Sequence, residues 1–406
     1  MRILLLTETP PWPLDSGGRI KTHHTLGMLS AEHEVHCHAL TRSLDAAIPP
    51  EVAARVRTMT LHARRTGPAA EVRALARALR RGWPLTIARH VDGRIAASIR
   101  DAARRLRADV VYCDHLSMME YARAAGGPIV YDAHNVESLL MKRYAAHVPP
   151  SARRLLASRE WRTLERYERR ACLDAAIVLA VSDVDAACLQ SLARGRVPVH
   201  VVPIAMDVAN TPVVVSTPPA SNPPAPEASA GPHQLLFVGG LHWPPNADAV
   251  VHFVRDVLPL VRRRMPAVEL TIVGRTDSSV ARAIAPEGGV RLAGAVGDLD
   301  PFYASASAVV VPLRSGSGLR VKILEAFARG VPVVSTPIGH EGIDVTPGVE
   351  LLSADDPAGF ADHVVSILTD RRRACAIAET ARRFVAAQYD IPVVAARLAA
   401  AMRVLA

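Results

Sequence analysis

The chain has 406 residues, more than one hydrophobic core usually organises, so we expect two domains. Half of the residues are apolar but only 4% are aromatic, so alanine, valine and leucine must fill the cores. No apolar run is long enough to span a bilayer, and the opening run Met1–Leu6 breaks before it forms a signal-peptide core. These features predict a cytoplasmic protein.

The formal net charge of +9 favours anionic partners, such as nucleic acid, anionic lipid or phosphorylated substrates. Nucleic acid is not expected, because the sequence lacks basic residues interleaved with aromatics and any recognisable nucleic-acid module. The five cysteines have no Cys-x-x-Cys spacing, which argues against a disulfide framework and against a zinc site. We expect buried, reduced thiols.

Short apolar runs alternate with helical patterns from the first residue, as in a parallel sheet built from βαβ units. In chain order, the strands expected in the first half are Ile3–Leu6, Glu34–Leu40, Val110–Tyr112, Ile129–Tyr131 and Ala176–Val181, with a helix over Lys21–Glu32. This part is interpreted as a Rossmann-like domain over residues 1–210.

Basic residues concentrate in residues 64–107, where apolar and basic positions alternate at helical spacing. A solvated helix face explains this pattern most simply. The alternative is a patch that holds the protein peripherally at the inner face of a membrane.

A change of composition marks residues 211–233, which are rich in proline and lack a hydrophobic period, so we interpret them as a linker. The strand pattern then resumes, and it predicts a second doubly wound domain over residues 234–385. The elements expected there are strands at Leu235–Val238, Leu270–Val273, Val290–Leu292, Ala308–Val311 and Val331–Ser335 and helices at Asp248–Arg263, Pro357–Leu368 and Arg371–Gln388. A last helix, within residues 386–406, is expected to pack back on the first domain.

Ligands of doubly wound sheets bind beyond the carboxyl ends of the strands, so the loops that follow strands carry the candidate sites. Gly17 and Gly18 follow the first strand and allow close approach of a ligand, although a structural turn is the alternative. Asp132, His134 and Asn135 follow the strand Ile129–Tyr131, and we expect them to point into the cleft between the domains. His134 is the candidate for contact with substrate.

In the second domain, Gly239 and Gly240 repeat the design of a strand followed by glycines. Asn246 and Asp248 come shortly after them. Their residue types favour a role in capping the next helix rather than in catalysis.

The most informative stretch runs from Val309 to Ser335, where a strand, a Gly/Ser loop, a helix and another strand follow in succession. Backbone donors at the start of a helix bind phosphate well. Arg320 and Lys322 oppose the helix dipole there, which suggests a bound diphosphate. Glu325 could accept hydrogen bonds from a ribose; an ordinary surface pair with Lys322 is the alternative.

This stretch resembles the donor-binding segment of retaining glycosyltransferases of the GT-B fold, in family 4. The likeness spans nearly the whole chain. It rests on Gly17-Gly18, Asp132-Ala-His134-Asn-Val-Glu137, Val201-Val-Pro203, Val238-Gly239-Gly240, Ile272-Val-Gly274, Gly294-Ala-Val296 and Leu324-Glu325-Ala326. It implies an α/β protein with two Rossmann-like domains that face a central cleft. The first, residues 1–210, would bind the acceptor, and the second, residues 234–385, the nucleotide sugar.

The resemblance also implies roles for single residues. The segment Gly294–Val296 would hold the nucleobase, Glu325 the ribose, and the loop that contains Gly316, Ser317, Gly318 and Leu319 the diphosphate. Gly18 would approach the donor phosphates, and His134 the transferred sugar. Gly17 and Gly240 belong to the same donor site.

Two positions depart from the family pattern. Ser317 stands where the family commonly has a glutamate, eight residues before Glu325, and His242 and Trp243 stand where it often has Arg and Lys. Related enzymes share the Gly/Ser-rich loop followed by Arg-x-Lys-Ile-Leu-Glu. We expect Arg320 and Lys322 to supply the missing positive charge and to act in catalysis.

The sequence therefore predicts a retaining, metal-independent enzyme that moves a sugar from a nucleoside diphosphate to an acceptor hydroxyl. No cofactor is expected, and the acceptor is a glycan, a lipid-linked molecule or a small molecule. A nucleotide-sugar epimerase of the same architecture is the nearest alternative. A non-catalytic protein with two ligand-binding lobes is the other.

Overall fold

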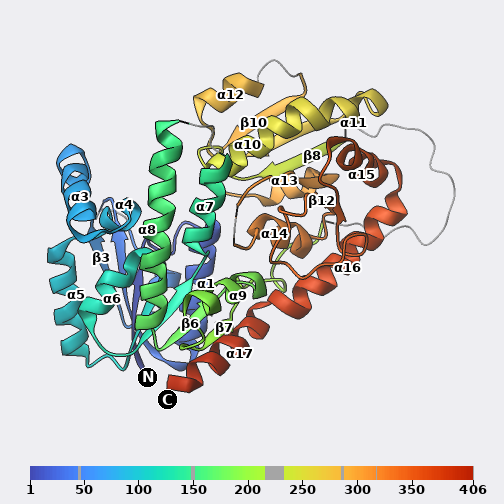
Figure 1. Cartoon of the computed structure of the whole chain (residues 1–406). Coiled ribbons are helices and arrows are strands. Elements are labelled where there is room, and N and C mark those ends of the chain that lie inside the picture. The colour runs from blue at the N-terminus through green and yellow to red at the C-terminus, as the bar shows by residue number, and fades with distance from the viewer. Residues whose placement is uncertain (44–46, 148–150, 215–232, 285–287, 317, 406) are drawn as a thin grey trace. The chain divides into compact units, whose positions relative to one another are not determined.

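The computed structural model describes residues 1–43, 47–147, 151–214, 233–284, 288–316 and 318–405. The chain forms two compact units (Figure 1). The first contains residues 1–205, 317–319 and 391–406, and the second contains residues 206–316 and 320–390. Most of the linker expected at 211–233, residues 215–232, lies outside the described residues.

The first unit is built on a parallel sheet of seven strands in the order β3-β2-β1-β4-β5-β6-β7. The strands are β1 (Arg2–Thr7), β2 (Glu34–Thr41), β3 (Thr58–Ala63), β4 (Val110–Asp114), β5 (Ile129–Ala133), β6 (Ile177–Ala180) and β7 (Val199–Val201). The sequence prediction missed β3 and β7. The short β7 and the polar, partly exposed β3 lie at the two edges of the sheet, where no continuous apolar run is required.

Helices accompany this sheet: α1 (Gly17–Glu32), α2 (Pro50–Ala53), α3 (Pro68–Arg81), α4 (Leu85–Ala88), α5 (Gly93–Leu106), α6 (Met119–Ala125), α7 (Glu137–His147), α8 (Ala152–Asp174) and α9 (Asp183–Leu192). Both faces of the central strands are apolar. In β1, Leu4 and Leu6 pack into one core, while Ile3 and Leu5 pack into the other. This double burial explains the near-continuous apolar runs in the sequence.

The last helix, α17 (Ile391–Met402), packs in the first unit and is followed by a short 3-10 turn, Arg403–Leu405. Its apolar side chains Val394 and Leu398 join the core that contains Ile3 and Leu5, and α17 contacts α1. The chain therefore returns to the unit in which it began.

The second unit has a parallel sheet of six strands in the order β10-β9-β8-β11-β12-β13. They are β8 (Gln234–Val238), β9 (Glu269–Val273), β10 (Val290–Gly294), β11 (Ala308–Val311), β12 (Val333–Ser335) and β13 (Leu352–Ser353). The helices are α10 (Pro244–His252), α11 (Leu258–Arg264), α12 (Ser278–Ile284), α13 (Asp300–Ser305), α14 (Val321–Arg329), α15 (Pro357–Thr369) and α16 (Arg371–Tyr389). A single π-helical turn, Phe253–Val257, joins α10 to α11.

The predicted fold class, two Rossmann-like α/β domains, is confirmed. The cysteines Cys37, Cys113, Cys172 and Cys375 are buried and Cys188 is half-buried, all as free thiols. None of the helices in the described ranges has both the length and the apolarity that crossing a lipid bilayer would require.

Candidate active site

Each sheet has a point where the strand order reverses, and ligands of doubly wound folds bind beside it. In the first unit this point lies between β1 and β4, and in the second between β8 and β11. The loops that leave these four strands carry most of the residues described below. The two sites are described separately.

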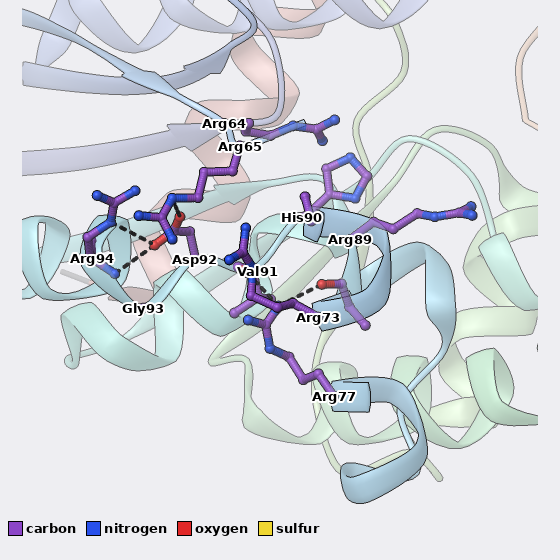
Figure 2. A pocket seen from close by; sticks show the side chains of 12 residues that line it. Arg64, Arg65, Arg73, Arg77, Arg89, His90, Val91, Asp92, Gly93 and Arg94 are labelled. Carbon is purple, nitrogen blue, oxygen red and sulfur yellow. Dashed lines mark hydrogen bonds and ion pairs between the residues drawn. The ribbon is translucent and has the colours of Figure 1, made fainter. Parts of the chain in front are cut away.

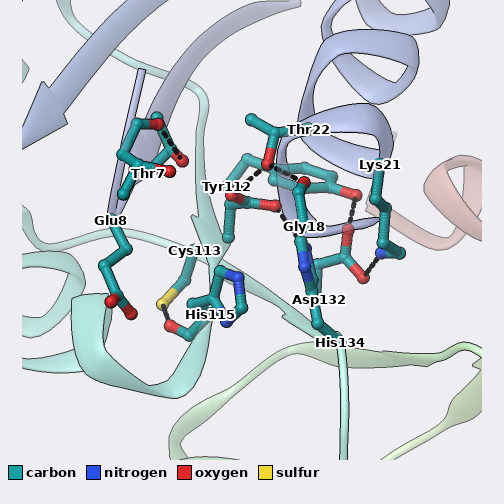
Figure 3. Close-up of polar contacts among 12 residues, drawn as sticks. Thr7, Glu8, Gly18, Lys21, Thr22, Tyr112, Cys113, His115, Asp132 and His134 are labelled. Atoms are coloured by element: carbon teal, nitrogen blue, oxygen red, sulfur yellow. Dashed lines mark hydrogen bonds and ion pairs between the residues drawn. The ribbon is translucent and has the colours of Figure 1, made fainter. Parts of the chain in front are cut away.

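In the first unit, His134 lies just past β5, beside His115 (Figure 3). It is hydrogen-bonded to Asp114 at the end of β4. The distance from Nε2 of His134 to Oδ1 of Asp114 is 2.7 Å. The hydroxyl of Thr22 in α1 donates to the other carboxylate oxygen at 2.8 Å. Asp114 and His134 are both buried, so the imidazole has a fixed orientation.

Burial tends to raise the pKa of Asp114, but His134, His115 and Lys21 outweigh it and hold that pKa below its usual range. Burial and the neighbouring His115 lower the pKa of His134 to about 4. At neutral pH the pair is therefore a carboxylate beside a neutral imidazole. Since Nε2 must carry the proton that bonds Asp114, Nδ1 is the acceptor nitrogen.

Gly18 and His115 lie next to His134. The rings of His115 and His134 have centroids 3.8 Å apart. A Cβ atom added to Gly18 would lie 3.6 Å from Nε2 of His115 and 3.8 Å from Nδ1 of His134. Gly17 and Gly18 are the first two residues of α1, so the helix N-terminus opens beside the two imidazoles.

Asp132 does not point toward a ligand, and this part of the prediction was wrong. It lies within β5, is fully buried, and forms an ion pair with the equally buried Lys21 of α1. The hydroxyl of Tyr112 donates to it at 2.7 Å. Side chains alternate along a strand, so Asp132 shares the face of Val130, which packs with α1.

A further polar pair lies at the end of β1. Glu8 accepts a hydrogen bond from Ser117 at 2.6 Å and contacts Nε2 of His90 at 3.1 Å. Burial tends to raise the pKa of Glu8, but His90, His115 and Ser117 outweigh it and hold the pKa well below its usual range. Glu8 is therefore an anion that connects His90 with the surroundings of His115.

In the second unit, Lys322 is the second residue of α14 and reaches across to the loop after β8. Its Nζ donates to the side-chain oxygen of Asn246 at 3.1 Å and lies 4.2 Å from the centre of the Phe237 ring. A Cβ on Gly239 would lie 2.7 Å from this Nζ and would displace the lysine, and the φ of 153° at Gly239 also favours glycine. Burial, and then the charge of Arg320, lower the pKa of Lys322 to about 7.

Arg320 immediately precedes α14 and is buried. Its guanidinium lies on the backbone of Gly316, where an added Cβ would lie 2.5 Å from Nη2. Gly316 has a φ of 144°, which also favours glycine. Arg320 and Lys322 thus both lie at the start of α14, as the sequence predicted, and neither projects into solvent.

Glu325 is buried on α14 and does not pair with Lys322 in a hydrogen bond or ion pair within the described part of the chain. The hydroxyl of Tyr303 donates to its carboxylate at 3.2 Å. Burial raises the pKa of Glu325. The expected alternative, a surface pair between Lys322 and Glu325, is therefore wrong.

The expected helix cap at Asn246 is also wrong. Helix α10 begins at Pro244, and Asn246 lies inside its first turn. Its amide donates to the carbonyl of Gly240 at 3.0 Å and its oxygen receives Lys322, so Asn246 joins the glycine loop to α14. Asp248 pairs with Arg314 at 2.5 Å instead of capping the helix.

The other predicted donor residues lie on the same edge of the second sheet or on the loop before α14. Gly240 lies against the ring of His242, and Val296 follows β10, whose last residue Gly294 has a φ of 74°. Gly318 has a φ of 75°, and Leu319 is buried. Ser317 lies outside the described residues.

Asp114, His115 and His134 could hold a metal ion, since one ligand atom of each lies within 4.8 Å of the others. The hydrogen bond between Asp114 and His134 accounts for two of these three groups without an ion. The sequence analysis did not single out Asp114, His115, Lys21 or Glu8. Asp114 and His115 follow the apolar run Val110–Cys113, so the rule that located His134 also applies to them.

Two solved structures have the same architecture. Sucrose-phosphate synthase from Thermosynechococcus elongatus superposes with a TM-score of 0.74 over 99% of this chain and 98% of that chain, at 16% identity. Anabaena HepE, crystallised with UDP and glucose, gives a TM-score of 0.66 over 98% and 99%, at 14% identity. Likeness at such identity shows the fold, and the fold is GT-B.

Two family models match consecutive parts of the chain. Glycosyltransferase Family 4 matches residues 27–210, and Glycosyl transferases group 1 matches residues 232–370. The chain therefore belongs to the family 4, group 1 glycosyltransferases, which confirms the resemblance found in the sequence.

Curated relatives are similar in sequence to this chain over part of their length. A GDP-mannose-dependent alpha-(1-6)-phosphatidylinositol monomannoside mannosyltransferase of Mycobacterium tuberculosis is 33% identical over 165 residues, which cover 36% of this chain and 42% of that protein. A phosphatidyl-myo-inositol mannosyltransferase of Mycolicibacterium smegmatis is 32% identical over 171 residues, 40% and 43% of the two chains. The chain thus spans less than half the length of the relatives it matches.

Proposed function

We propose that the protein transfers a sugar from a nucleoside diphosphate to an acceptor hydroxyl, with retention of the anomeric configuration and without a metal ion. The family, the GT-B fold and the two sites support this proposal. The acceptor is proposed to be a glycan or a glycolipid, as the names of the mannosyltransferase relatives suggest.

One observation carries the proposal: Arg320 and Lys322 gather at the start of α14, beside the glycine loop after β8. Two cations at a helix N-terminus oppose the dipole of the helix. Burial, and then the charge of Arg320, lower the pKa of Lys322, so its positive charge is unfavourable in the free protein. A diphosphate would be stabilised by both side chains and by the backbone donors of the loop.

The remaining donor contacts are proposed for Glu325 and for the end of β10. The carboxylate of Glu325, held by Tyr303, is proposed to accept hydrogen bonds from the ribose hydroxyls. The backbone of Gly294–Val296 is proposed to hold the nucleobase.

In the proposed reaction, the bond between the anomeric carbon and the diphosphate oxygen breaks, and its electron pair stays on the diphosphate. The acceptor oxygen bonds to the same face of that carbon, and the acceptor proton passes to the departing diphosphate. Arg320 and Lys322 stabilise the negative charge that develops on the leaving group. His134 is proposed to contact the transferred sugar through its acceptor nitrogen, Nδ1.

A lipid-linked acceptor is favoured by the surface of α3. The helix buries its small residues Ala74 and Ala78 and exposes the larger Val72, Leu75 and Leu79, by 68%, 49% and 62%. Exposed apolar residues on a helix rich in arginine are typical of segments that lie in an anionic membrane surface. We therefore propose peripheral membrane association through residues 64–107.

The transferase assignment is tested by product analysis with nucleotide sugars of several bases, using NMR to read the anomeric configuration of the product.

Lys322→Ala is expected to lower kcat/KM by about 100- to 1,000-fold. Glu325→Ala is expected to weaken donor binding by about tenfold, since it removes hydrogen bonds to the ribose. Arg263→Ala, an exposed site in the same unit, is the control. Release of an altered sugar without an acceptor would instead indicate an epimerase.

Flotation with vesicles tests the membrane proposal. The wild-type chain is expected to float with vesicles that contain anionic lipid, and the double variant Leu75→Ser, Leu79→Ser is expected to remain in solution. Equal flotation of the two proteins would exclude α3 as the attachment point.

A further inference from the structure

A cavity of about 310 Å³ lies in the first unit between α3, α4 and the start of α5 (Figure 2). We call it the arginine pocket. Six arginines line it together with one carboxylate in the described chain, Asp92. The arginines are Arg64, Arg65, Arg73, Arg77, Arg89 and Arg94. The cavity does not overlap the residues proposed to bind the donor.

Several of the side chains that line the arginine pocket are held in place by hydrogen bonds and ion pairs. Nη1 of Arg77 donates to the carbonyls of Ala88 and Val91, at 2.8 and 2.5 Å. Arg89 pairs with Glu71 at 2.8 Å. Asp92 caps α5 and lies 3.9 Å from Arg65 and 3.7 Å from Arg94, so one carboxylate is shared by two guanidinium groups. The pocket therefore exists before any ligand binds.

Arg64 and Arg73 differ from these residues. Across the ranges that the structure describes, the guanidinium of neither makes a hydrogen bond or an ion pair. Guanidinium groups remain charged at any physiological pH, so their mutual repulsion persists in the free protein. An anion in the cavity would offset this repulsion. Arginine binds phosphate through two parallel hydrogen bonds, which suits phosphate better than a single-point anion.

The pocket is linked to the residues around His134 through Glu8. Its lining residue His90 contacts Glu8, and the charge of His115 helps to hold down the pKa of Glu8. The rings of His115 and His134 are in turn in contact. A ligand that occupies the arginine pocket would therefore extend toward the proposed transfer site along the carboxyl edge of the first sheet.

We propose that the arginine pocket binds a phosphate group of the acceptor substrate, with Arg64 and Arg73 as its main ligands. That the ligand is the acceptor rests on the proposed function, whereas the binding of phosphate in this pocket does not. The volume admits a phosphate or diphosphate group with part of its alcohol, in the range of small-molecule sites. The phosphate belongs either to a lipid head group or to a water-soluble acceptor.

Calorimetric titration with inorganic pyrophosphate tests the proposal. The titration uses the Lys322→Ala background, which weakens binding at the donor site and is common to all the variants compared. The double variant Arg64→Gln, Arg73→Gln is expected to raise Kd by at least about tenfold, since two bidentate partners are lost. Arg80→Gln, an exposed arginine of α3 outside the pocket, is expected to change Kd by less than about twofold. The proposal would be overturned if the double variant and Arg80→Gln bound pyrophosphate equally weakly, or if neither variant bound it more weakly than the background protein.

Thermal melting of each variant checks that it is folded; because Arg64 and Arg73 hold no partner in place, melting temperatures close to wild type are expected. Vesicles distinguish the two sources of phosphate. If the ligand is a lipid head group, the double variant loses binding to vesicles of phosphatidylcholine with phosphatidic acid, whereas Arg80→Gln keeps it. If vesicle binding is equal but pyrophosphate binding is lost, the phosphate belongs to a soluble acceptor.

Failure of this inference differs from failure of the proposed function. If only the arginine pocket is wrongly assigned, the double variant retains wild-type pyrophosphate binding, and nucleoside diphosphates still raise the Tm through Lys322. If only the transferase assignment is wrong, nucleoside diphosphates have no effect on Tm, while pyrophosphate still binds in a manner that depends on Arg64 and Arg73.

Discussion

Buried charged groups beside the two switch points are arranged in opposite ways. In the first unit Asp132 is matched by Lys21, and Asp114 by His134 and Thr22, so the buried carboxylates are stabilised within the protein. In the second unit Lys322 lies beside another cation, Arg320, and its pKa falls to about 7. The first arrangement is complete in the free protein, whereas the second becomes favourable when an anion binds. Asp132 and Lys21 therefore hold the fold, whereas Arg320 and Lys322 are the residues proposed to bind the donor.

The largest effect is expected on stability, when the buried pair of Asp132 and Lys21 is broken. Asp132→Ala leaves the buried Lys21 without its carboxylate, which should cost about 3–5 kcal/mol and lower Tm by roughly 10 °C. Differential scanning calorimetry measures this loss. The control, Asp109→Ala, removes an exposed pair with Arg2 and should leave Tm close to wild type. Similar losses in both variants would contradict the comparison.

His134→Ala should affect the reaction and not the donor affinity. We expect kcat to fall by about 100-fold or more, because contact with the transferred sugar is lost during the chemical step. The rise in Tm with nucleoside diphosphate should remain. A variant that turned over at the wild-type rate would remove His134 from the site.

The second arrangement predicts a dependence on pH. Lys322 is charged below about pH 7 and loses its proton above it, so the affinity for a nucleoside diphosphate should fall by about tenfold per pH unit above 7, until the pKa of the bound state is reached. Lys322→Arg keeps its charge and should flatten this profile. Titration between pH 6 and 9 measures both. Parallel profiles in the two proteins would show that another group titrates.

Chelation should have the smallest effect. Since Asp114 and His134 satisfy each other, we expect treatment with EDTA to leave the transfer rate unchanged. A loss of rate that a divalent cation restores would instead place an ion among Asp114, His115 and His134.

The sequence located features that depend on local order. The strands of both sheets were predictable where they are buried on both faces, as in β1 and β11, since such strands are continuous apolar runs. Arg320, Lys322 and Glu325 were predictable because a strand, a glycine loop and a helix follow one another directly. The resemblance of the chain to family 4 was first seen in the same stretch.

Features that join distant segments were not predictable. The sequence suggested that Asp132 faces a ligand, but its partner Lys21 lies 111 residues away. It suggested that Asn246 caps a helix, but Lys322, 76 residues along the chain, holds its side chain. The arginine pocket likewise combines the helix α3 with the loop before α5.

The sequence by itself determined the two-domain α/β class, the family and the cations at the start of α14, because periodicity and the order of short motifs specify them. Only the tertiary structure decided which buried charges are paired, as Asp132 is with Lys21 and Asp114 with His134. Neutralisation depends on distances between side chains that the folded sheets bring together, and one-dimensional spacing does not contain those distances.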